Sequence, residues 1–198
     1  MKQRLSIFQK HLGAFLCLFC LLCLDNCRRA HPWLTEGVWH SEKALLPILN
    51  RKADKYRLER PLVRALIWQE SRFRENVVGK AGEIGLMQIT QACVSDWCRI
   101  NHKPRPHRNT LFLPELNLEI GCWHLAQAAK HWAGHPSQEV LMLAQYNAGR
   151  TAVLRNHPKA REKDSEPISP EDLAFPTTRA YVRNILARKM FYLEHERK

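Results

Sequence analysis

Apolar positions along this chain recur mostly at the spacing of an α-helix, and no segment keeps the strict alternation that is typical of a strand. The first two helices are predicted over 43–56 and from Pro61, which the first turn of a helix tolerates, to about Phe73. Further helices are predicted over 86–100, over 115–133, from the N-cap Ser137 onward and over 177–196. The sequence therefore predicts a mainly α-helical single domain.

Two longer connections separate these helices. Residues 99–114 contain three prolines and many cations, which favours a loop. Residues 157–176 are polar and rich in proline, and because connections of this length are often functional, we consider this one a candidate flap over a site. The glycine-rich segment 79–85 is expected to form the turn that leads into the helix over 86–100.

The N-terminus has the pattern of an export signal. Residues 1–11 carry three cations, and the thirteen residues that follow, 12–24, contain no charge. As a helix this run would span about 20 Å, less than the ~30 Å of a membrane's hydrocarbon core. We predict that the chain is exported, with 1–27 as a signal peptide or membrane anchor and 28–198 as the folded domain; a buried core helix is the alternative. No small-residue cleavage site follows, so a cleaved signal, an uncleaved anchor and a lipidated Cys27 stay open.

Composition and charge narrow the choice of partner. With 45% hydrophobic and 25% charged residues, the chain resembles an average soluble protein, which excludes a disordered tail, a collagen-like fibre and a polytopic membrane protein. Lys and Arg number 31 against 19 Asp and Glu, and the formal charge of +12 favours anionic partners. Because export separates the chain from cytosolic DNA and RNA, we expect no nucleic-acid partner. A carboxylate-bearing polymer of the cell envelope or a membrane surface is favoured instead.

The cysteines and histidines do not predict a metal site. Four of the seven cysteines lie in or beside the apolar N-terminal segment, where cysteine acts as a small hydrophobic residue. Among Cys93, Cys98 and Cys122 one disulfide is feasible outside the cytosol, and its pairing cannot be read from the sequence. The ten histidines lack a paired helical motif, so we expect surface histidines rather than a zinc site. They include His102, His107, His124, His131 and His135.

One carboxyl lies where a purely structural helix would place an apolar side chain. Glu70 continues the face that Val63, Leu66 and Ile67 form at helical spacing. Burial on such a face raises the pKa of a carboxyl, and a glutamic acid with a raised pKa can protonate a leaving-group oxygen. Glu70 is thus a candidate general acid. The alternative is that it ends the helix and turns into solvent, or pairs with one of the arginines that follow it.

Four short motifs, in order, carry a resemblance to a known family. They are Glu70-Ser71-Arg72-Phe73, Gly85-Leu86-Met87-Gln88, Ala144-Gln145-Tyr146-Asn147-Ala148-Gly149 and Tyr181-Val182. The set resembles the ordered motifs of the lytic transglycosylases, goose-type-lysozyme-like enzymes that cut bacterial peptidoglycan. The resemblance covers residues 45–185 and implies a single lysozyme-like (goose-type) helical domain.

The resemblance also assigns roles to particular residues. Glu70 looks like the catalytic acid/base. The implied substrate-binding residues are Ser71, Met87, Gln88, Tyr146, Asn147 and Tyr181. Without the resemblance, Met87 and Tyr181 would be interpreted as core residues, and the Tyr-Asn-Ala-Gly run as the end of a helix.

The chain departs from the family pattern at several positions near these motifs. Gly79 stands where the family commonly has serine, Glu75 where proline is common, and Gln145 where a small or aromatic residue is usual. Glu83 replaces a small apolar residue just before the second motif. It is either a second acidic group near the cleft or an exposed carboxylate in the turn, and we favour the turn. These departures leave the acid in place and bear on which part of the substrate the cleft prefers.

The implied reaction uses one carboxyl and neither a metal nor an organic cofactor. The acid protonates the bond that follows an N-acetylmuramyl residue, and the substrate's acetamide stabilises the developing cation. The same carboxylate then deprotonates the 6-hydroxyl that closes a 1,6-anhydro ring. Two alternatives stay open: lysozyme-type hydrolysis by water, and a non-catalytic module that binds peptidoglycan or a membrane. In the favoured interpretation the partner is the peptidoglycan glycan strand. The protein acts on it in the periplasm or cell envelope, and is either soluble there or tethered to the membrane through its N-terminus.

Overall fold

The computed structural model describes residues 40–161 and 166–195. Within these ranges it contains seven α-helices: α2 (Glu42–Lys55), α3 (Arg60–Ser71), α4 (Gln91–Ile100), α5 (Pro114–His131), α6 (Gln138–Ala148), α7 (Arg150–Asn156) and α8 (Pro176–His195). Three short 3-10 helices lie in the connections: η2 (Arg108–Phe112), η3 (Pro158–Arg161) and η4 (Pro170–Asp172). The described part contains no strand, only isolated bridges around Ile84, which confirms the predicted mainly α-helical fold. The predicted export signal and the domain boundary at residue 27 lie outside the described residues.

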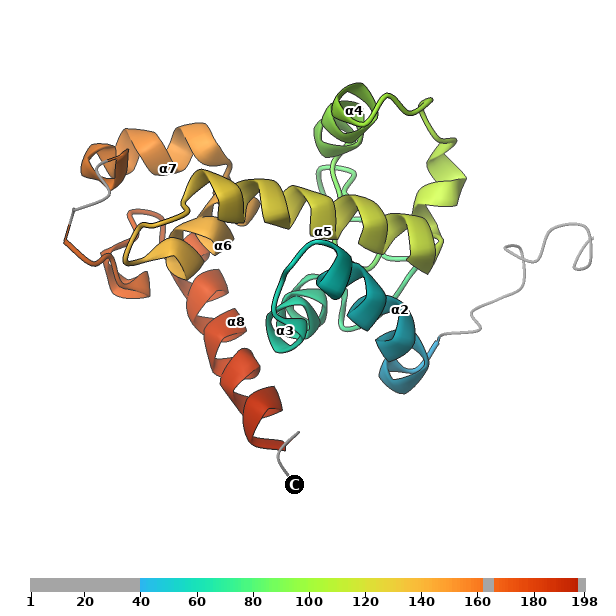
Figure 1. The fold of residues 1–198 in the computed structure, drawn as a ribbon, viewed down its shortest axis with the longest axis horizontal. Helices are drawn as coiled ribbons and strands as arrows, with labels where there is room; N and C mark the ends of the chain where they lie inside the picture. The colour runs from blue at the N-terminus through green and yellow to red at the C-terminus, as the bar shows by residue number, and fades with distance from the viewer. Residues whose placement is uncertain (1–39, 162–165, 196–198) are drawn as a thin grey trace, which may run out of the picture. The chain divides into compact units, whose positions relative to one another are not determined.

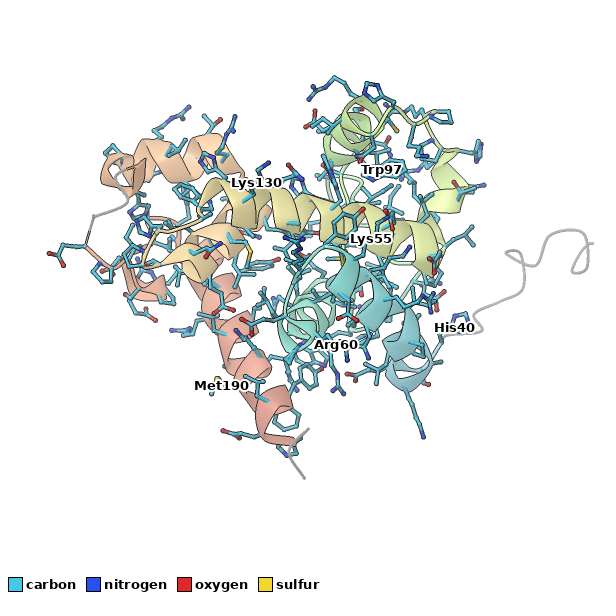
Figure 2. All side chains as sticks on the ribbon, in the orientation of Figure 1. His40, Lys55, Arg60, Trp97, Lys130 and Met190 are labelled. Atoms are coloured by element: carbon cyan, nitrogen blue, oxygen red, sulfur yellow. The ribbon has the colours of Figure 1, made fainter. Side chains whose placement is uncertain are left out.

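The helices pack around one apolar core. α3 packs against α8 and α2, while α5 packs against α2, α4 and α6. In the view of Figure 1, α5 crosses the middle of the described fold, with α2 and α3 on one side of it and α4 and α7 on the other. Figure 2 shows how densely side chains fill the spaces between these helices. The core includes Leu66 and Ile67 of α3 and Leu118 and Leu125 of α5, all of them almost completely buried.

Local signals in the sequence explain where the helices near the site begin and end. The N-cap of α4 is Thr90, whose side-chain oxygen accepts a hydrogen bond from the amide of Cys93 (3.1 Å). α3 has Pro61 in its first turn and ends at Arg72, whose φ is +54°. A left-handed residue cannot continue a right-handed helix. The chain therefore leaves α3 two residues after Glu70, which puts this carboxyl in the last turn.

The helix predicted over 86–100 begins later than expected, at Gln91. Residues before it form a turn in which the amide and carbonyl of Ile84 pair with those of Ile89 (3.1 and 3.0 Å). This pairing uses the backbone groups that a helix would need, so the Gly-Leu-Met-Gln motif is a turn and not helical.

Other predicted connections and caps also differ from the structure. η2 occupies part of the loop predicted over 99–114. α7 follows Gly149 directly and was not predicted, because a helix of seven residues gives little periodicity. Ser137 precedes α6, but its hydroxyl accepts a hydrogen bond from the amide of Ile168 (2.6 Å) instead of capping the helix. η3 and η4 lie within 157–176, and the idea of a flap there stays a prediction.

The three described cysteines form no disulfide, and one of the described histidines is buried. Cys93, Cys98 and Cys122 are free, so no disulfide joins them, and burial raises the pKa of the Cys93 and Cys122 thiols to about 12. The expectation of surface histidines is wrong for His135, which is buried and accepts a hydrogen bond at Nδ1 from the amide of Ser137 (2.9 Å). Across residues 40–161 and 166–195, no group of His, Cys, Asp or Glu could hold a metal ion. In the same ranges no helix has both the length and the apolar content to cross a membrane.

Candidate active site

The candidate general acid lies at the C-terminal end of a buried helix. Glu70 is in the last turn of α3 and keeps partial exposure. Leu66 and Ile67, on the same face of the helix, are 0% and 1% exposed. The carboxyl therefore lies at the boundary between the apolar core and the surface, where a ligand can reach it while one side stays desolvated.

One hydrogen bond within the described residues reaches the Glu70 carboxyl. The hydroxyl of Tyr181 on α8 donates to Oε1 of Glu70 (2.5 Å). Burial raises the pKa of Glu70 from 4.5 to about 7; the bond from Tyr181 opposes this rise, and the negative charge of Glu83 adds to it. Burial, followed by the charge of Glu70, raises the pKa of Tyr181 well above 10, so the phenol stays protonated and donates. Near neutral pH both forms of the carboxyl are populated, as a group that first gives and then takes a proton requires.

Tyr146 connects the Gly-Leu-Met-Gln turn to this carboxyl. Its hydroxyl, at the end of α6, donates to the carbonyl of Met87 (2.8 Å). Burial and then the charge of Glu70 raise the pKa of Tyr146, so the phenol stays protonated and donates. The next residue, Asn147, is exposed, and its Oδ1 accepts a hydrogen bond from the hydroxyl of Thr178 on α8 (2.8 Å). Its NH₂ group has no partner among the described residues and is available to a ligand.

A buried asparagine holds the Gly-Leu-Met-Gln turn in place. Asn117 of α5 is 0% exposed. Its Oδ1 accepts a bond from the amide of Met87 (2.9 Å), and its Nδ2 donates to the carbonyls of Ile84 and Leu111 (2.9 and 2.8 Å). Gly85 has a φ of +74°, and a Cβ there would lie 2.4 Å from Nδ2 of Asn117, so only glycine fits. This positioning role was not predicted from the sequence; the available signal was an asparagine between two leucines, Leu116 and Leu118.

The side chain of Met87 packs into the core and does not line the cleft. It is fully buried, and its sulfur lies against Gly121 of α5, where a Cβ would be 2.4 Å away. The Sγ of Cys122 lies 3.9 Å from the same sulfur. The carbonyl of Met87, and not its side chain, faces the site, where it accepts the hydrogen bond from Tyr146.

Two further predicted substrate-binding residues use their side-chain donors internally. Gln88 has a φ of +46°, and its Nε2 donates to the carbonyls of Val77 and Gly85 (3.2 and 2.8 Å), which leaves Oε1 as an acceptor. Ser71 is 1% exposed, and its hydroxyl donates to the carbonyl of Ile67 (3.2 Å). The structure thus leaves one free acceptor on Gln88, next to Met87 in the turn, and ties the Ser71 hydroxyl to α3.

Glu83 lies in the turn and also acts on Glu70. Its Oε2 accepts a hydrogen bond from the amide of Ala81 (3.0 Å). The carboxylate fills the space beside Gly79, where a Cβ would lie 2.2 Å from Oε2. Glu83 is half-buried, and its charge contributes to the raised pKa of Glu70. The two alternatives for Glu83, a turn carboxylate and a second acid near the cleft, are therefore not exclusive.

The fold and these motifs agree with comparisons to known proteins. The model of the family described as the transglycosylase SLT domain matches residues 47–169. This chain belongs to that family. It is 32% identical over 116 residues to the membrane-bound lytic murein transglycosylase C of Serratia proteamaculans (strain 568), and 30% identical over 116 residues to that of Yersinia pestis (strain Pestoides F). Both matches cover 56% of this chain and 32% of the relative, so the chain spans about a third of the length of these relatives.

Solved structures share the fold of this SLT domain. An inactive mutant of the lytic transglycosylase Slt from Pseudomonas aeruginosa matches with a TM-score of 0.66 and 26% identity, covering 76% of this chain and 24% of that chain. The 70-kDa soluble lytic transglycosylase from Escherichia coli matches with a TM-score of 0.66 at 23% identity, over the same shares of the two chains, and supports the fold alone. The predicted lysozyme-like helical domain is thereby confirmed.

Within the SLT domain, residues that are far apart in the sequence meet at one place. Tyr181 of α8 donates to Glu70 of α3, Tyr146 of α6 donates to the carbonyl of Met87, and Asn147 at the end of α6 accepts from Thr178 of α8. The arrangement supplies one titratable carboxyl, one phenol that donates to it, and amide groups at its edge.

Proposed function

We propose that this SLT domain is a peptidoglycan lytic transglycosylase in which Glu70 is the only acid/base. The observation that carries the proposal is the state of this carboxyl: its pKa is raised to about 7, and Tyr181 donates to it. No cation pairs with it among the described residues, and a cation there would have held it ionised. Membership of the SLT family supports the same proposal, as do its relatives, which are lytic murein transglycosylases.

The proposed reaction moves one proton out and back. Protonated Glu70 gives its proton to the oxygen of the β-1,4 bond between N-acetylmuramyl and N-acetylglucosaminyl residues, and this oxygen leaves with the bonding electrons. The acetamide of the muramyl residue stabilises the cation at C1, while the bond from Tyr181 stabilises the ionised carboxylate. Glu70 then takes the proton of the 6-hydroxyl, whose oxygen attacks C1 and closes the 1,6-anhydro ring. Glu70 returns to its starting state, and no water is consumed.

The proposed substrate contacts come from the groups that remain free at the edge of the site. The NH₂ of Asn147 and Oε1 of Gln88 would bind hydroxyl or N-acetyl groups of the sugars. Tyr146 and Tyr181 would shape the cleft around the carboxyl. The side chain of Met87 would support these groups from the core.

One observation favours lysozyme-type hydrolysis as a second candidate. The carboxylate of Glu83 is near enough to Glu70 to raise its pKa. A glycosidase that uses water needs a second carboxylate as base or nucleophile. Hydrolysis would leave a free reducing end, whereas the transglycosylase reaction leaves a product that is lighter by one water.

Mass spectrometry of purified peptidoglycan digested by the full-length protein separates these reactions. We expect anhydro products from the wild type and none from Glu70→Gln, which should still sediment with peptidoglycan. Hydrated products would overturn the transglycosylase proposal in favour of hydrolysis. If both proteins bind peptidoglycan and neither cleaves it, the chain is a binding module.

We infer that the domain acts on the envelope side of the cytoplasmic membrane, with residues 1–27 as signal or anchor. The basic and apolar pattern of the N-terminus supports this, and the relatives are named membrane-bound. Fractionation of cells that express the full-length chain tests the inference. Recovery of the protein in the cytosol with an intact Met1 would contradict it.

A further inference from the structure

A surface hollow of about 470 Å³ lies between α3 and α8. Trp68 in its lining comes two residues before Glu70 and points from the opposite side of α3, because an α-helix turns by about 100° per residue. The α3–α8 hollow is therefore separate from the candidate active site, and none of its lining residues has a role in the proposed reaction. The lining includes Trp68, Gln69, Arg72, Asn184, Arg188 and Phe191.

Two arginines stack on one indole in this hollow. The guanidinium carbons of Arg72 and Arg188 lie 3.1 and 3.6 Å from the centre of the Trp68 ring. Attraction between each cation and the electron-rich ring holds these two like charges close together. Burial, and then the charges of Arg188 and Arg74, lower the pKa of Arg72, which is the direction expected for a cation beside other cations.

No carboxylate of the described chain neutralises this pair. Within residues 40–161 and 166–195, neither Arg72 nor Arg188 forms an ion pair or donates a side-chain hydrogen bond. The neighbouring cation of α8 differs, since Lys189 pairs with Glu59 and Glu139 (2.8 and 2.6 Å). The N–H groups at the edges of both guanidiniums are therefore available to a ligand, and their planar geometry matches the oxygens of a phosphate group.

Neutral donors and a positive field complete the lining. The side-chain amides of Gln69 and Asn184 form no hydrogen bond within the part of the chain that the structure describes, and can donate to a ligand. Glu194 is an exposed carboxylate near this end of α8, and the three arginines named above outnumber it. The formal charge of the whole chain, +12, has the same sign as the hollow and attracts an anionic surface.

Exposed apolar side chains lie beside the arginine pair. Phe191, which lines the hollow, is 43% exposed, and Met190 before it is 54% exposed. Met190 is labelled on this part of α8 in Figure 2. Cations next to exposed aromatic and apolar side chains are typical of helices that lie at a lipid–water interface. A phosphate ion or an acidic peptide would match the cations alone, whereas an anionic lipid matches both the cations and the apolar side chains.

We propose that the α3–α8 hollow binds the phosphodiester headgroup of an anionic membrane lipid, so that this face of the domain lies on the membrane surface. Arg72 and Arg188 bind the phosphate oxygens by charge-assisted hydrogen bonds, and the amides of Gln69 and Asn184 bind hydroxyl groups of the headgroup. Phe191 contacts the acyl chains just below the headgroups. This contact is made by the folded domain itself, in addition to any attachment through the N-terminus, and it does not depend on the proposed reaction.

The first test maps the face that touches lipid. The full-length protein is mixed with vesicles of phosphatidylcholine, with or without phosphatidylglycerol, and its arginines are modified with p-hydroxyphenylglyoxal and located by mass spectrometry. The apolar N-terminal segment is present in both samples, so only the headgroup differs. Arg72 and Arg188 should react roughly fivefold more slowly on the anionic vesicles. Arg108, an exposed arginine of η2, is the internal control and should react equally on both.

Two outcomes of this experiment would overturn the inference. Equal slowing at Arg108 would mean that a basic protein is attracted to an anionic surface without a preferred face. Equal reaction of Arg72 and Arg188 on the two kinds of vesicle would mean that the hollow does not meet the lipid. Neither readout uses peptidoglycan, so a failure of the proposed enzymatic function would leave this test intact.

A second test measures headgroup binding without a membrane. Dihexanoyl-phosphatidylglycerol, kept below its micelle concentration, is titrated into the full-length protein, and binding is followed by the NMR signal of the Trp68 indole. Arg72→Gln/Arg188→Gln should weaken binding roughly tenfold. Lys43→Gln/Arg108→Gln removes two exposed charges elsewhere and should leave binding unchanged.

A charge-conserving variant keeps this second test decisive if the first variant unfolds. Arg72→Lys/Arg188→Lys retains both cations but loses the planar donors, so it should bind more weakly than the wild type while it unfolds at a similar temperature. Wild-type affinity in both arginine variants would overturn the assignment of the site. Displacement of the lipid by an equal concentration of inorganic phosphate would show a plain phosphate site and overturn the assignment of a lipid.

Discussion

The pKa of Glu70 is set by burial and by two neighbours that act in opposite directions. Burial raises its pKa most, the hydrogen bond from Tyr181 lowers it, and the charge of Glu83 raises it. The proposed reaction starts from the protonated carboxyl, so the rate should fall as the pH rises through about 7, where the proton is lost. Changing either neighbour should move this alkaline limb in a known direction.

Tyr181→Phe should move the alkaline limb of the rate profile to higher pH and lower the maximal rate. The change removes the donor that stabilises the ionised carboxylate, so the pKa of Glu70 rises above about 7 and the second proton transfer becomes harder. Rates of anhydro-product release across pH measure both effects. Tyr192→Phe, on the same helix and also buried, is the matched control and should leave the limb where it is. An unmoved limb in Tyr181→Phe would show that this phenol does not act on Glu70 during turnover.

Glu83→Gln should move the limb the other way, to lower pH, by a fraction of a unit. Removing a negative charge near the carboxyl makes ionisation of Glu70 easier, so its pKa falls. The same pH profile measures the shift, and Glu115→Gln, in the first turn of α5, is the control because this charge does not act on the pKa of Glu70. A drop in rate at every pH together with loss of hydrated products would instead mark Glu83 as the base of a hydrolase.

At the scale of elements, α5 determines where the Gly-Leu-Met-Gln turn lies. Asn117 forms hydrogen bonds to the amide of Met87 and the carbonyl of Ile84, which the turn cannot pair within itself. Gly121 leaves room for the sulfur of Met87. The carbonyl that Tyr146 holds is therefore placed by a helix and not by the turn alone.

Asn117→Ala should destabilise the domain by about 2–4 kcal/mol, because the buried amide of Met87 loses its acceptor and two carbonyls lose a donor. Urea unfolding followed by circular dichroism measures the free energy of unfolding. Asn109→Ala, at an exposed asparagine of η2, should change it by less than about 0.5 kcal/mol. A small effect at Asn117 would mean that water or a rearranged turn replaces its bonds.

At the scale of the whole described domain, α2 and α5 are joined by a charged cluster. Glu119 of α5 accepts from Nζ of Lys52 (2.8 Å), from the hydroxyl of Tyr56 (2.5 Å) and from Lys55. Burial alone would raise the pKa of Glu119, but these bonds outweigh it and hold the pKa at about 2.

This cluster should make stability depend on acid pH. The pKa of Glu119 is lower in the folded state than the ordinary 4.5, so its contribution is present above pH 4.5 and is lost as the pH falls toward 2. Wild type should lose up to about 3 kcal/mol more than Glu119→Gln over that range, measured by urea unfolding at each pH. Glu115→Gln is the matched comparison, since its side chain is 56% exposed against 14% for Glu119, and its effect should be much smaller. Parallel pH curves for Glu119→Gln and wild type would contradict the prediction.

The fold class and most of the helices could be predicted from the sequence, because local periodicity already specifies which faces are apolar. α2, α3, α5 and α8 lie within a few residues of their predicted ranges. The helix over 86–100 was predicted to begin too early, since nothing local shows that Asn117, some thirty residues later, pairs with this segment. The missed α7 is too short to carry a period.

For the candidate site, the sequence by itself determined the acid and the motif set. Glu70 stands out because a carboxyl on an apolar face is visible in the order of residues alone. Only the tertiary structure decided what surrounds it: that Tyr181 donates to it, and that Ser71 and the side chain of Met87 turn into the core. Hydrogen bonds, desolvation and Coulomb interactions depend on distances through space, and for residues more than a hundred positions apart the packing of helices sets those distances.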